Sequence, residues 1–419
     1  MEQVTHRPLA RPARAGESAL AAALLQKYFE PMKRGRLEIT LPSGRRLQFG
    51  DHPEELSAAF RIHNNAFFRK CILYGDVGFG EAYVDGDWDT DHVADVIRWM
   101  ILNLENNPGL SGSKRTFSAV NLLKLANRAY HLFRPNSVRG SRENITAHYD
   151  LSNEFFRAFL DPSMVYSSAF FTENTMDLES AQREKMDRLC RKLNIDARHH
   201  VLEIGCGWGS FAVHAARNYG CRVTGITISQ QQYELARRRV KEEGLEDRIE
   251  ILLHDYRAVT GQFDRIVSIE MLEAVGDAFL PVFFQKCHQV LKKEGVLGIQ
   301  VITSPDSRYE AFKRGVDWTQ KHIFPGSLLP SVGALNDAVR HAGDLVLRNL
   351  EDFGAHYART LFTWRQQFED AWDRIRSLGF DDSFRRKWIY YLSYCEAAFA
   401  MRNISVVQMV YSRPNNTLF

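Results

Sequence analysis

An alternation of short apolar runs with longer amphipathic segments begins near residue 196 and constrains the fold more than any other feature of the sequence. This alternation is typical of a parallel sheet with helices on both faces. The runs that predict strands are His200–Ile204, Arg222–Ile226, Ile249–Leu253, Arg265–Ile269, Val296–Ile302, Leu345–Leu350 and Ser405–Tyr411. We therefore predict a Rossmann-like α/β domain in the C-terminal part of the chain.

A helical insertion, Thr360–Met401, separates the last two predicted strands. Its first helix carries four apolar side chains on one face: Trp364, Phe368, Trp372 and Ile375. A stripe of this kind packs against another apolar surface. We expect it to cover either the domain core or a channel for a lipid chain.

The first predicted strand leads directly into a glycine-rich turn. Residues Val201–Gly209 read VLEIGCGWG, and a helix is predicted at Phe211–Tyr219. The glycines at 205, 207 and 209 let the backbone turn sharply and let a ligand approach main-chain atoms closely. This pattern predicts a nucleotide-binding crevice at the carboxyl end of the strand.

The residues around this turn distinguish between two classes of nucleotide cofactor. Dinucleotide sites favour GxGxxG and an acidic residue after the second strand, whereas this turn has GxGxG and the second strand ends at Ser229 without an acid. Glu203 would repel a pyrophosphate but attract an ammonium and a sulfonium. The sequence therefore favours S-adenosylmethionine over NAD. Asp255 follows the third strand, where we expect adenine contact, with a simple turn role as the alternative.

Composition excludes several functional classes. The length of 419 residues predicts two domains, and the net charge of +3 argues against nucleic-acid binding. No apolar run reaches the roughly 18 residues that span a bilayer. The chain has neither a secretory signal pattern nor paired cysteines, so we expect a cytoplasmic protein without disulfides or a metal.

Residues 1–105 predict a smaller α+β domain. A helix is expected at Ala19–Phe29 and strands at Leu37–Leu41 and Arg46–Phe49, and we interpret the Gly- and Asp-rich stretch Tyr74–Trp88 as turns and a docking surface.

Residues 106–142 contain no acidic residue, several basic ones and apolar residues at helical spacing. We predict a basic amphipathic linker there, which either lies on an anionic lipid surface or packs on a neighbouring domain.

From residue 143 onward, the sequence resembles the cyclopropane-fatty-acyl-phospholipid synthases and the related mycolic acid methyltransferases. The motifs that carry the resemblance are HYDLSN from His148, MVYSSA from Met164, LEIGCGWGS from Leu202, GITIS from Gly225, FDRIVSIEMLEAVG from Phe263 and FGAHYARTL from Phe353. The resemblance implies that residues 143–419 form a class I S-adenosylmethionine-dependent methyltransferase domain. It also implies that residues 1–105 help to engage lipid.

The implied reaction transfers the methyl group, as a methylene, to the double bond of an unsaturated acyl chain in a membrane phospholipid. The resemblance places the protein peripherally at the inner face of the cell membrane and leaves a homodimer open. The residues that we expect to contact the cofactor are Tyr166, Ser167, Glu203, Gly205, Cys206, Gly207, Gly209, Thr227, Ile228, Gln232, Asp255, Tyr256 and Arg257.

In the family, a bound bicarbonate is thought to take a proton from the new methyl group and so close the ring. The resemblance implies a bicarbonate site made of Glu273, Tyr357, the Ile302 amide, Ser168 and Gln300. Ser168 stands where the family has a cysteine that acts through its backbone, and Gln300 stands where it has a histidine. Because a glutamine cannot titrate, bicarbonate binding stays open, as does a methyl-branched or methylene product without a ring.

Two carboxylates follow the fourth predicted strand closely. We assign the catalytic role to Glu273 and a structural role to Glu270.

Two other functions remain open: a small-molecule amine N-methyltransferase, because some plant alkaloid enzymes resemble the family, and a non-catalytic lipid- or cofactor-binding relative. The N-terminal domain and the basic stretch argue against the first, and the intact glycine turn argues against the second. Acyl length and headgroup preference are not predicted.

Overall fold

The computed structural model describes residues 19–105 and 151–417 and divides the chain into two compact units, Met1–Ser111 and Gly112–Phe419. The predicted basic linker at 106–142 lies outside the described residues. Among the helices that are described, none is long and apolar enough to cross a membrane.

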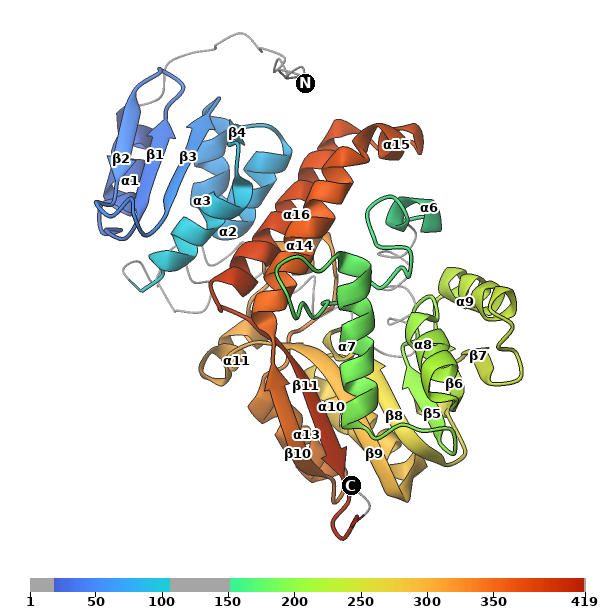
Figure 1. Cartoon of the computed structure of the whole chain (residues 1–419). Helices are drawn as coiled ribbons and strands as arrows, with labels where there is room; N and C mark the ends of the chain where they lie inside the picture. The colour runs from blue at the N-terminus through green and yellow to red at the C-terminus, as the bar shows by residue number, and fades with distance from the viewer. Residues whose placement is uncertain (1–18, 106–150, 418–419) are drawn as a thin grey trace. The chain divides into compact units, whose positions relative to one another are not determined.

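The N-terminal unit is a four-stranded sheet with three helices (Figure 1). The strand order is β2-β1-β3-β4, with β1 parallel to β3 and the other pairs antiparallel. Alternate residues of β3 are buried, so one face of the sheet packs on the core. The elements are α1 (Ala19–Phe29), β1 (Arg36–Thr40), β2 (Arg46–Phe49), β3 (Ser57–Ile62), α2 (Ala66–Val84), β4 (Trp88–Asp89) and α3 (Val93–Leu102).

The Gly- and Asp-rich stretch is mostly helical, so the prediction of turns there is wrong. It forms the second half of α2, which is kinked at Gly75, where φ is 59°. The helix continues because its aromatic side chains pack inward, with the rings of Phe79 and Trp88 only 4.4 Å apart. This packing outweighs the low helix propensity of the glycines.

The second unit confirms the predicted Rossmann-like α/β fold. Its seven-stranded sheet has the order β10-β11-β9-β8-β5-β6-β7, and β11 runs antiparallel to both β10 and β9, whereas the other neighbouring pairs are parallel. The strands are β5 (His200–Ile204), β6 (Arg222–Thr227), β7 (Ile249–Leu253), β8 (Phe263–Ile269), β9 (Leu291–Thr303), β10 (Val346–Asp352) and β11 (Ser405–Ser412). All seven predicted strands are present, and β9 begins earlier than predicted.

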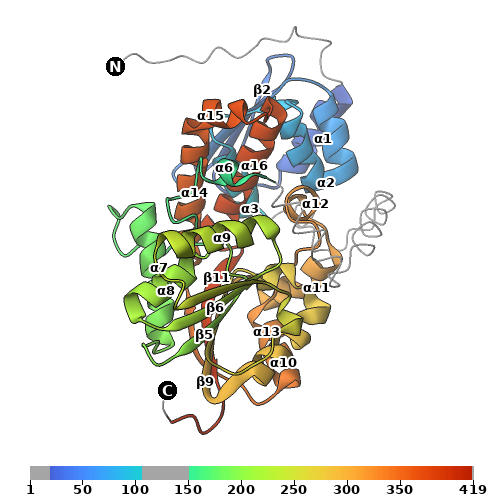
Figure 2. The same ribbon diagram turned by 90° about the vertical axis from the view of Figure 1, so that its right-hand side faces the viewer.

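Helices cover both faces of this sheet (Figure 2). One face packs against α7 (Leu178–Lys192), α8 (Ser210–Tyr219) and α9 (Gln230–Glu242). The other packs against α10 (Leu280–Val290) and α13 (Val332–Ala342). The remaining helices include α6 (Asn153–Phe156), α11 (Asp306–Arg314), α12 (Trp318–His322) and the short η1 (Tyr256–Ala258), η2 (Leu272–Ala274) and η3 (Asp277–Phe279).

The predicted helical insertion is present and begins earlier, at Gly354. It consists of α14 (Gly354–Asp370), α15 (Trp372–Ser377) and α16 (Asp382–Ala400), and it rises beyond the carboxyl ends of the parallel strands (Figure 1). The predicted first helix is divided at Ala371, so Trp364 and Phe368 lie on α14 whereas Trp372 and Ile375 lie on α15, and all four side chains are buried. The chain reverses strand order between β5 and β8, which is where ligands bind in sheets of this type.

Candidate active site

The glycine turn after β5 is held against the neighbouring strand. The backbone amides of Gly205 and Cys206 both donate to the carbonyl of Ile226, at 3.0 and 2.9 Å. Gly205, Gly207 and Gly209 have φ of 83°, 51° and 82°. These left-handed conformations favour glycine. At Gly205, an added Cβ would also lie 2.9 Å from Met271 Cγ, so only glycine fits there.

Glu203 lies at the base of this turn with an unused hydrogen-bond acceptor. The residue is 3% exposed, and its Oε2 atom is buried without a hydrogen-bond partner among the described residues. Burial raises the pKa of Glu203 well above its usual value. A ligand ammonium would supply both the missing donor and a compensating charge. The turn therefore fits the amino-acid end of S-adenosylmethionine.

The ends of β6 and β7 border the same turn. Thr227 Oγ1 donates to Gln232 Oε1 at 2.8 Å, so these two predicted cofactor residues are in contact, and Ile228 lies between them in the chain. Asp255 caps η1 and pairs with Arg257 at 2.7 Å, and the guanidinium lies 5.4 Å from the ring of Tyr256. The turn role of Asp255 is thus observed, and its adenine contact stays a prediction.

The segment that contains Tyr166, Ser167 and Ser168 crosses between α7 and the helical insertion. Tyr166 stacks on Trp364 with ring centroids 5.2 Å apart, and its hydroxyl lies 2.9 Å from that of Tyr391. Ser167 Oγ accepts a hydrogen bond from the buried Lys185 at 2.7 Å. Tyr166 therefore belongs to an aromatic wall beside the site.

Three of the five predicted bicarbonate residues converge on a carboxylate of the protein itself. Glu270 Oε1 accepts from the Ser168 amide at 2.9 Å and from Gln300 Nε2 at 2.8 Å, and Tyr357 donates to Glu270 Oε2 at 2.7 Å. The other two predicted residues contact each other, because the Ile302 amide donates to Glu273 Oε1 at 2.5 Å. Glu270, which sequence reasoning treated as structural, therefore lies where the resemblance implies an anion.

The backbone of Glu270 is in an unusual conformation for this residue type. Its φ is 48°, in the left-handed region, and its amide donates to the Gln300 carbonyl at 2.7 Å. A conformation of this kind costs about 1–3 kcal/mol in a residue other than glycine and occurs often at functional sites. The strain directs the carboxylate toward three donors. The spacing of two carboxylates after a buried strand was the only sign of Glu270 in the sequence.

The two neighbouring carboxylates differ in their environments. Burial, and then the nearby Glu270 carboxylate, raises the pKa of Glu273 to about 8. Burial also raises the pKa of Glu270, but Lys185 and the hydrogen bonds from Gln300, Ser168 and Tyr357 oppose this. Burial and the nearby Glu270 carboxylate therefore favour the protonated form of Glu273, and Glu270 is the better candidate for the charged member of the pair.

Comparisons with known proteins show the family to which the chain is related. A family model described as mycolic acid cyclopropane synthetase matches residues 136–409. The chain is 38% identical over 371 residues to the tuberculostearic acid methyltransferase of Mycobacterium tuberculosis, covering 84% of this chain and 82% of that protein. It is 36% identical over 357 residues to the cyclopropane-fatty-acyl-phospholipid synthase of Escherichia coli, covering 85% and 88%.

A solved structure extends the comparison to the cofactor. The mycolic acid cyclopropane synthase CmaA1 complexed with SAH and CTAB is 28% identical, with a TM-score of 0.60 over 65% of this chain and 98% of that one. A family match over more than half of the chain, together with these relatives, decides the assignment. The chain belongs to the mycolic acid cyclopropane synthetase family and is a methyltransferase that uses S-adenosylmethionine.

Proposed function

We propose that this enzyme adds a one-carbon unit to the double bond of an unsaturated acyl chain carried by a phospholipid. The observation that carries the proposal is the Glu270 carboxylate, held by donors from three elements beside an aromatic wall. The E. coli relative is named for a phospholipid substrate. The CmaA1 complex contains CTAB, a detergent with one long alkyl chain. Both support an acyl chain as the substrate.

When bound, S-adenosylmethionine supplies a methyl group that its sulfonium makes electrophilic. The alkene π pair forms the new carbon–carbon bond, while the bond to sulfur breaks with its electron pair left on sulfur. The second alkene carbon then carries positive charge. Tyr166, Trp364 and Tyr357 surround the site with aromatic faces, and the rings of Tyr166 and Tyr357 lie 5.2 and 6.1 Å from that of Trp364. Aromatic faces and a carboxylate both stabilise such a cation.

We assign the removal of the proton to Glu270. If the proton comes from the new methyl group, the C–H electron pair closes the cyclopropane ring. If it comes from a neighbouring chain carbon, or from the methyl group after a hydride shift, the pair forms a double bond, and the product is methyl-branched or carries a methylene. None of these routes needs an oxidant or a reductant. In this assignment Glu270 replaces bicarbonate.

Ring closure is the outcome that the family favours. A base attached to the end of β8 reaches only the C–H bonds that lie beside Glu270, which is compatible with either outcome. The neighbouring Gln300 cannot titrate and so cannot take the proton instead. The product therefore depends on which C–H bond the pocket presents to this carboxylate.

Mass spectrometry tests the function. The purified chain is incubated with S-adenosylmethionine and vesicles of mono-unsaturated phospholipid, and we expect the acyl chain to gain the mass of one methylene. A reagent that cleaves double bonds then distinguishes the products, because a ring resists cleavage and a branched or methylene chain does not. Methylation of amines without any gain on vesicles would contradict the proposal.

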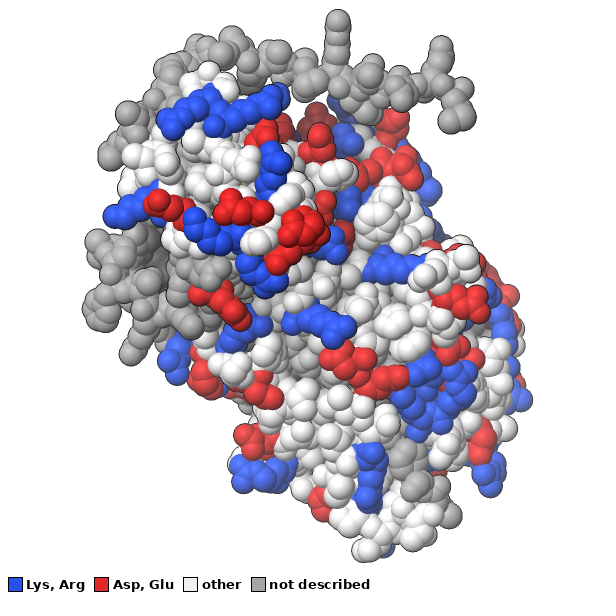
Figure 3. Space-filling view, turned by 60° about the vertical axis from the view of Figure 1, so that its left-hand side comes forward, with Lys and Arg blue, Asp and Glu red and all other residues white. Residues whose placement is uncertain are grey.

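We also propose that the protein binds the membrane surface peripherally through its N-terminal unit. The supporting observation is a set of exposed apolar side chains on α1 and α2: Leu24, Tyr28, Ile72 and Leu73. On the face shown in Figure 3, acidic and basic side chains are interspersed. The exposed apolar side chains are therefore the feature that supports lipid binding by the described part of this unit.

A further inference from the structure

Two buried glutamines face each other between interior strands of the seven-stranded sheet. Gln300 of β9 and Gln408 of β11 are paired in the antiparallel register, and both are 0% exposed. A buried carboxamide costs free energy unless its oxygen and its two N–H groups find partners. The direction in which each amide points is therefore set by the polar groups around it.

Lys192, at the end of α7, sets the direction of the Gln408 amide. An ammonium group donates hydrogen bonds and cannot accept them, and Lys192 Nζ lies 2.8 Å from Gln408 Oε1. The amide nitrogen of Gln408 consequently points the other way. It donates to Gln300 Oε1 at 3.1 Å and to the Lys185 carbonyl at 3.4 Å. Turning this amide over would place two donors against each other at Lys192.

The same reasoning extends to Gln300. Its oxygen already accepts from Gln408, so its nitrogen is directed toward Glu270 Oε1 at 2.8 Å and the Ser168 carbonyl at 3.5 Å. A chain of donors thus runs from Lys192 through two amides to the carboxylate. Gln300 presents a donor to Glu270, and its acceptor is turned away.

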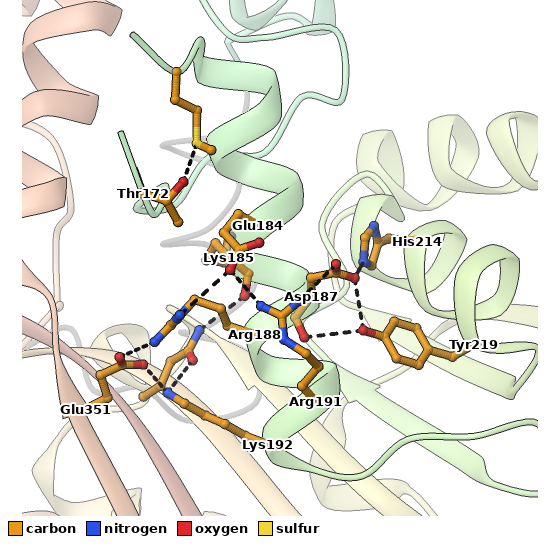
Figure 4. Close-up of polar contacts among 12 residues, drawn as sticks. Thr172, Glu184, Lys185, Asp187, Arg188, Arg191, Lys192, His214, Tyr219 and Glu351 are labelled. Atoms are coloured by element: carbon orange, nitrogen blue, oxygen red, sulfur yellow. Dashed lines mark hydrogen bonds and ion pairs between the residues drawn. The ribbon is translucent and has the colours of Figure 1, made fainter. Parts of the chain in front are cut away.

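Lys192 is itself held in place by charged neighbours. Its ammonium lies 2.5 Å from Glu351 Oε2, and Glu351 also accepts from Arg188 (Figure 4). Although burial opposes it, hydrogen bonds from Lys192 and Arg188 lower the pKa of Glu351. The side chains of Lys192 and Glu351 are 17% and 28% exposed, so the chain of donors begins near the surface.

We propose that Lys192 and Gln408 are positioning residues that act through Gln300 to keep a hydrogen-bond donor directed at the Glu270 carboxylate. The proposal rests on the role of Glu270 given above. We call the chain of donors formed by Lys192, Gln408 and Gln300 the relay. If its direction were lost, Gln300 could turn its oxygen toward Glu270, which would disfavour the charged form of the Glu270 carboxylate. The titratable groups that face Glu270 among the described residues are Lys185 of α7, Glu273 of η2 and Tyr357 of α14, and none of the variants below changes them.

The test measures the titration of Glu270 in the full chain. Glutamate carboxyl carbons are labelled with carbon-13 and followed by NMR across pH, and the Glu270 signal is identified by its loss in Glu270→Gln. In Lys192→Met and in Gln408→Leu we expect the midpoint to rise by about one pH unit, the size of one weakened hydrogen bond to a charged group. The acidic limb of the pH profile of lipid methylation should move by the same amount.

Two further variants separate this role from a general structural one. Lys192→Arg keeps a donor toward Gln408, so its Glu270 titration midpoint should stay close to that of the parent. Lys292→Met removes an ammonium that pairs with Asp264 at 2.8 Å, away from the relay, and should leave the Glu270 midpoint unchanged. In Lys192→Met the Glu351 carboxylate keeps Arg188 as its partner, which favours a folded variant.

The outcomes distinguish the relay from the proposed function. An unchanged Glu270 midpoint in both Lys192→Met and Gln408→Leu would overturn the relay, whatever the activity. A raised midpoint in a protein whose parent does not methylate lipid vesicles would uphold the relay and refute the proposed function.

Discussion

Three donors from distant parts of the chain meet at the Glu270 carboxylate, so a change confined to this side chain tests the chemistry directly. Glu270→Gln keeps the size of the side chain and removes the proton acceptor. Because general base catalysis contributes about 10²–10⁴-fold, we expect lipid methylation to fall by about that factor. The rate is measured by transfer of a labelled methyl group to vesicles. A variant that retains the parent rate would exclude Glu270 as the base.

Glu270→Gly provides a matched variant. Glycine suits the left-handed backbone at this position, and the Ser168, Gln300 and Tyr357 donors remain without a carboxylate. We expect added bicarbonate or formate to restore activity to Glu270→Gly and to have no effect on Glu270→Gln, whose side chain still fills the space. The parent should not depend on bicarbonate. If neither anion restores the activity of Glu270→Gly, the result would argue against the proposal that Glu270 takes the place of bicarbonate.

Glu273 should make stability depend on pH. Its pKa is about 8 in the folded protein and near 4.5 when unfolded, because burial disfavours its charge. Between these values the unfolded chain binds fewer protons, so stability falls as pH rises. When the pH is raised from about 6 to about 9, the unfolding free energy of the parent should fall. We expect the fall in Glu273→Gln to be smaller by a few kcal/mol, because glutamine does not titrate. Urea unfolding at the two pH values measures this, and equal losses would contradict it.

In the turn that joins β5 to α8, we expect the backbone geometry to serve the binding of S-adenosylmethionine. Gly205→Ala would place a Cβ 2.9 Å from Met271 Cγ at a φ of 83°, so the turn must move. We expect affinity for S-adenosylmethionine to fall at least about tenfold, the effect of 1.4 kcal/mol, as measured by calorimetry. Gly261→Ala is the control, since its φ is 97° and only Phe263 comes within 4.0 Å. Equal effects of both variants would show that general strain is responsible.

At the scale of the whole molecule, the proposed function requires the catalytic unit to reach a lipid surface. Ile72 is 52% exposed on α2 and Leu24 is 46% exposed on α1, so both apolar side chains are available for contact with lipid. We expect the double variant Leu24→Glu with Ile72→Glu to bind phospholipid vesicles at least about tenfold more weakly, because burial of each apolar side chain contributes about 1.5–3 kcal/mol. Vesicle sedimentation measures the binding. Thermal unfolding should not change, and unaltered sedimentation would exclude this surface.

Local patterns were sufficient to predict most of the second unit. The strands, the glycine turn and the apolar face of α14 each depend on spacing within a few residues, and periodicity records such spacing directly. The helix α2 shows the limit of this reasoning. Its glycines predict turns, whereas in the structure the segment is helical and its aromatic side chains pack inward, with Phe79 against Trp88.

The resemblance suggested candidate site residues, but only the tertiary structure decided how they pair. Ser168 and Tyr357 lie 102 and 87 positions away from Glu270 in the chain, and no local pattern joins them. The relay through Gln300 and Gln408 depends on the register of two strands and on Lys192 from a helix that packs on them. Sequence periodicity reports which side of an element is buried. Hydrogen-bond partners are set by where distant elements meet, and that is decided only when the whole sheet and its helices have packed.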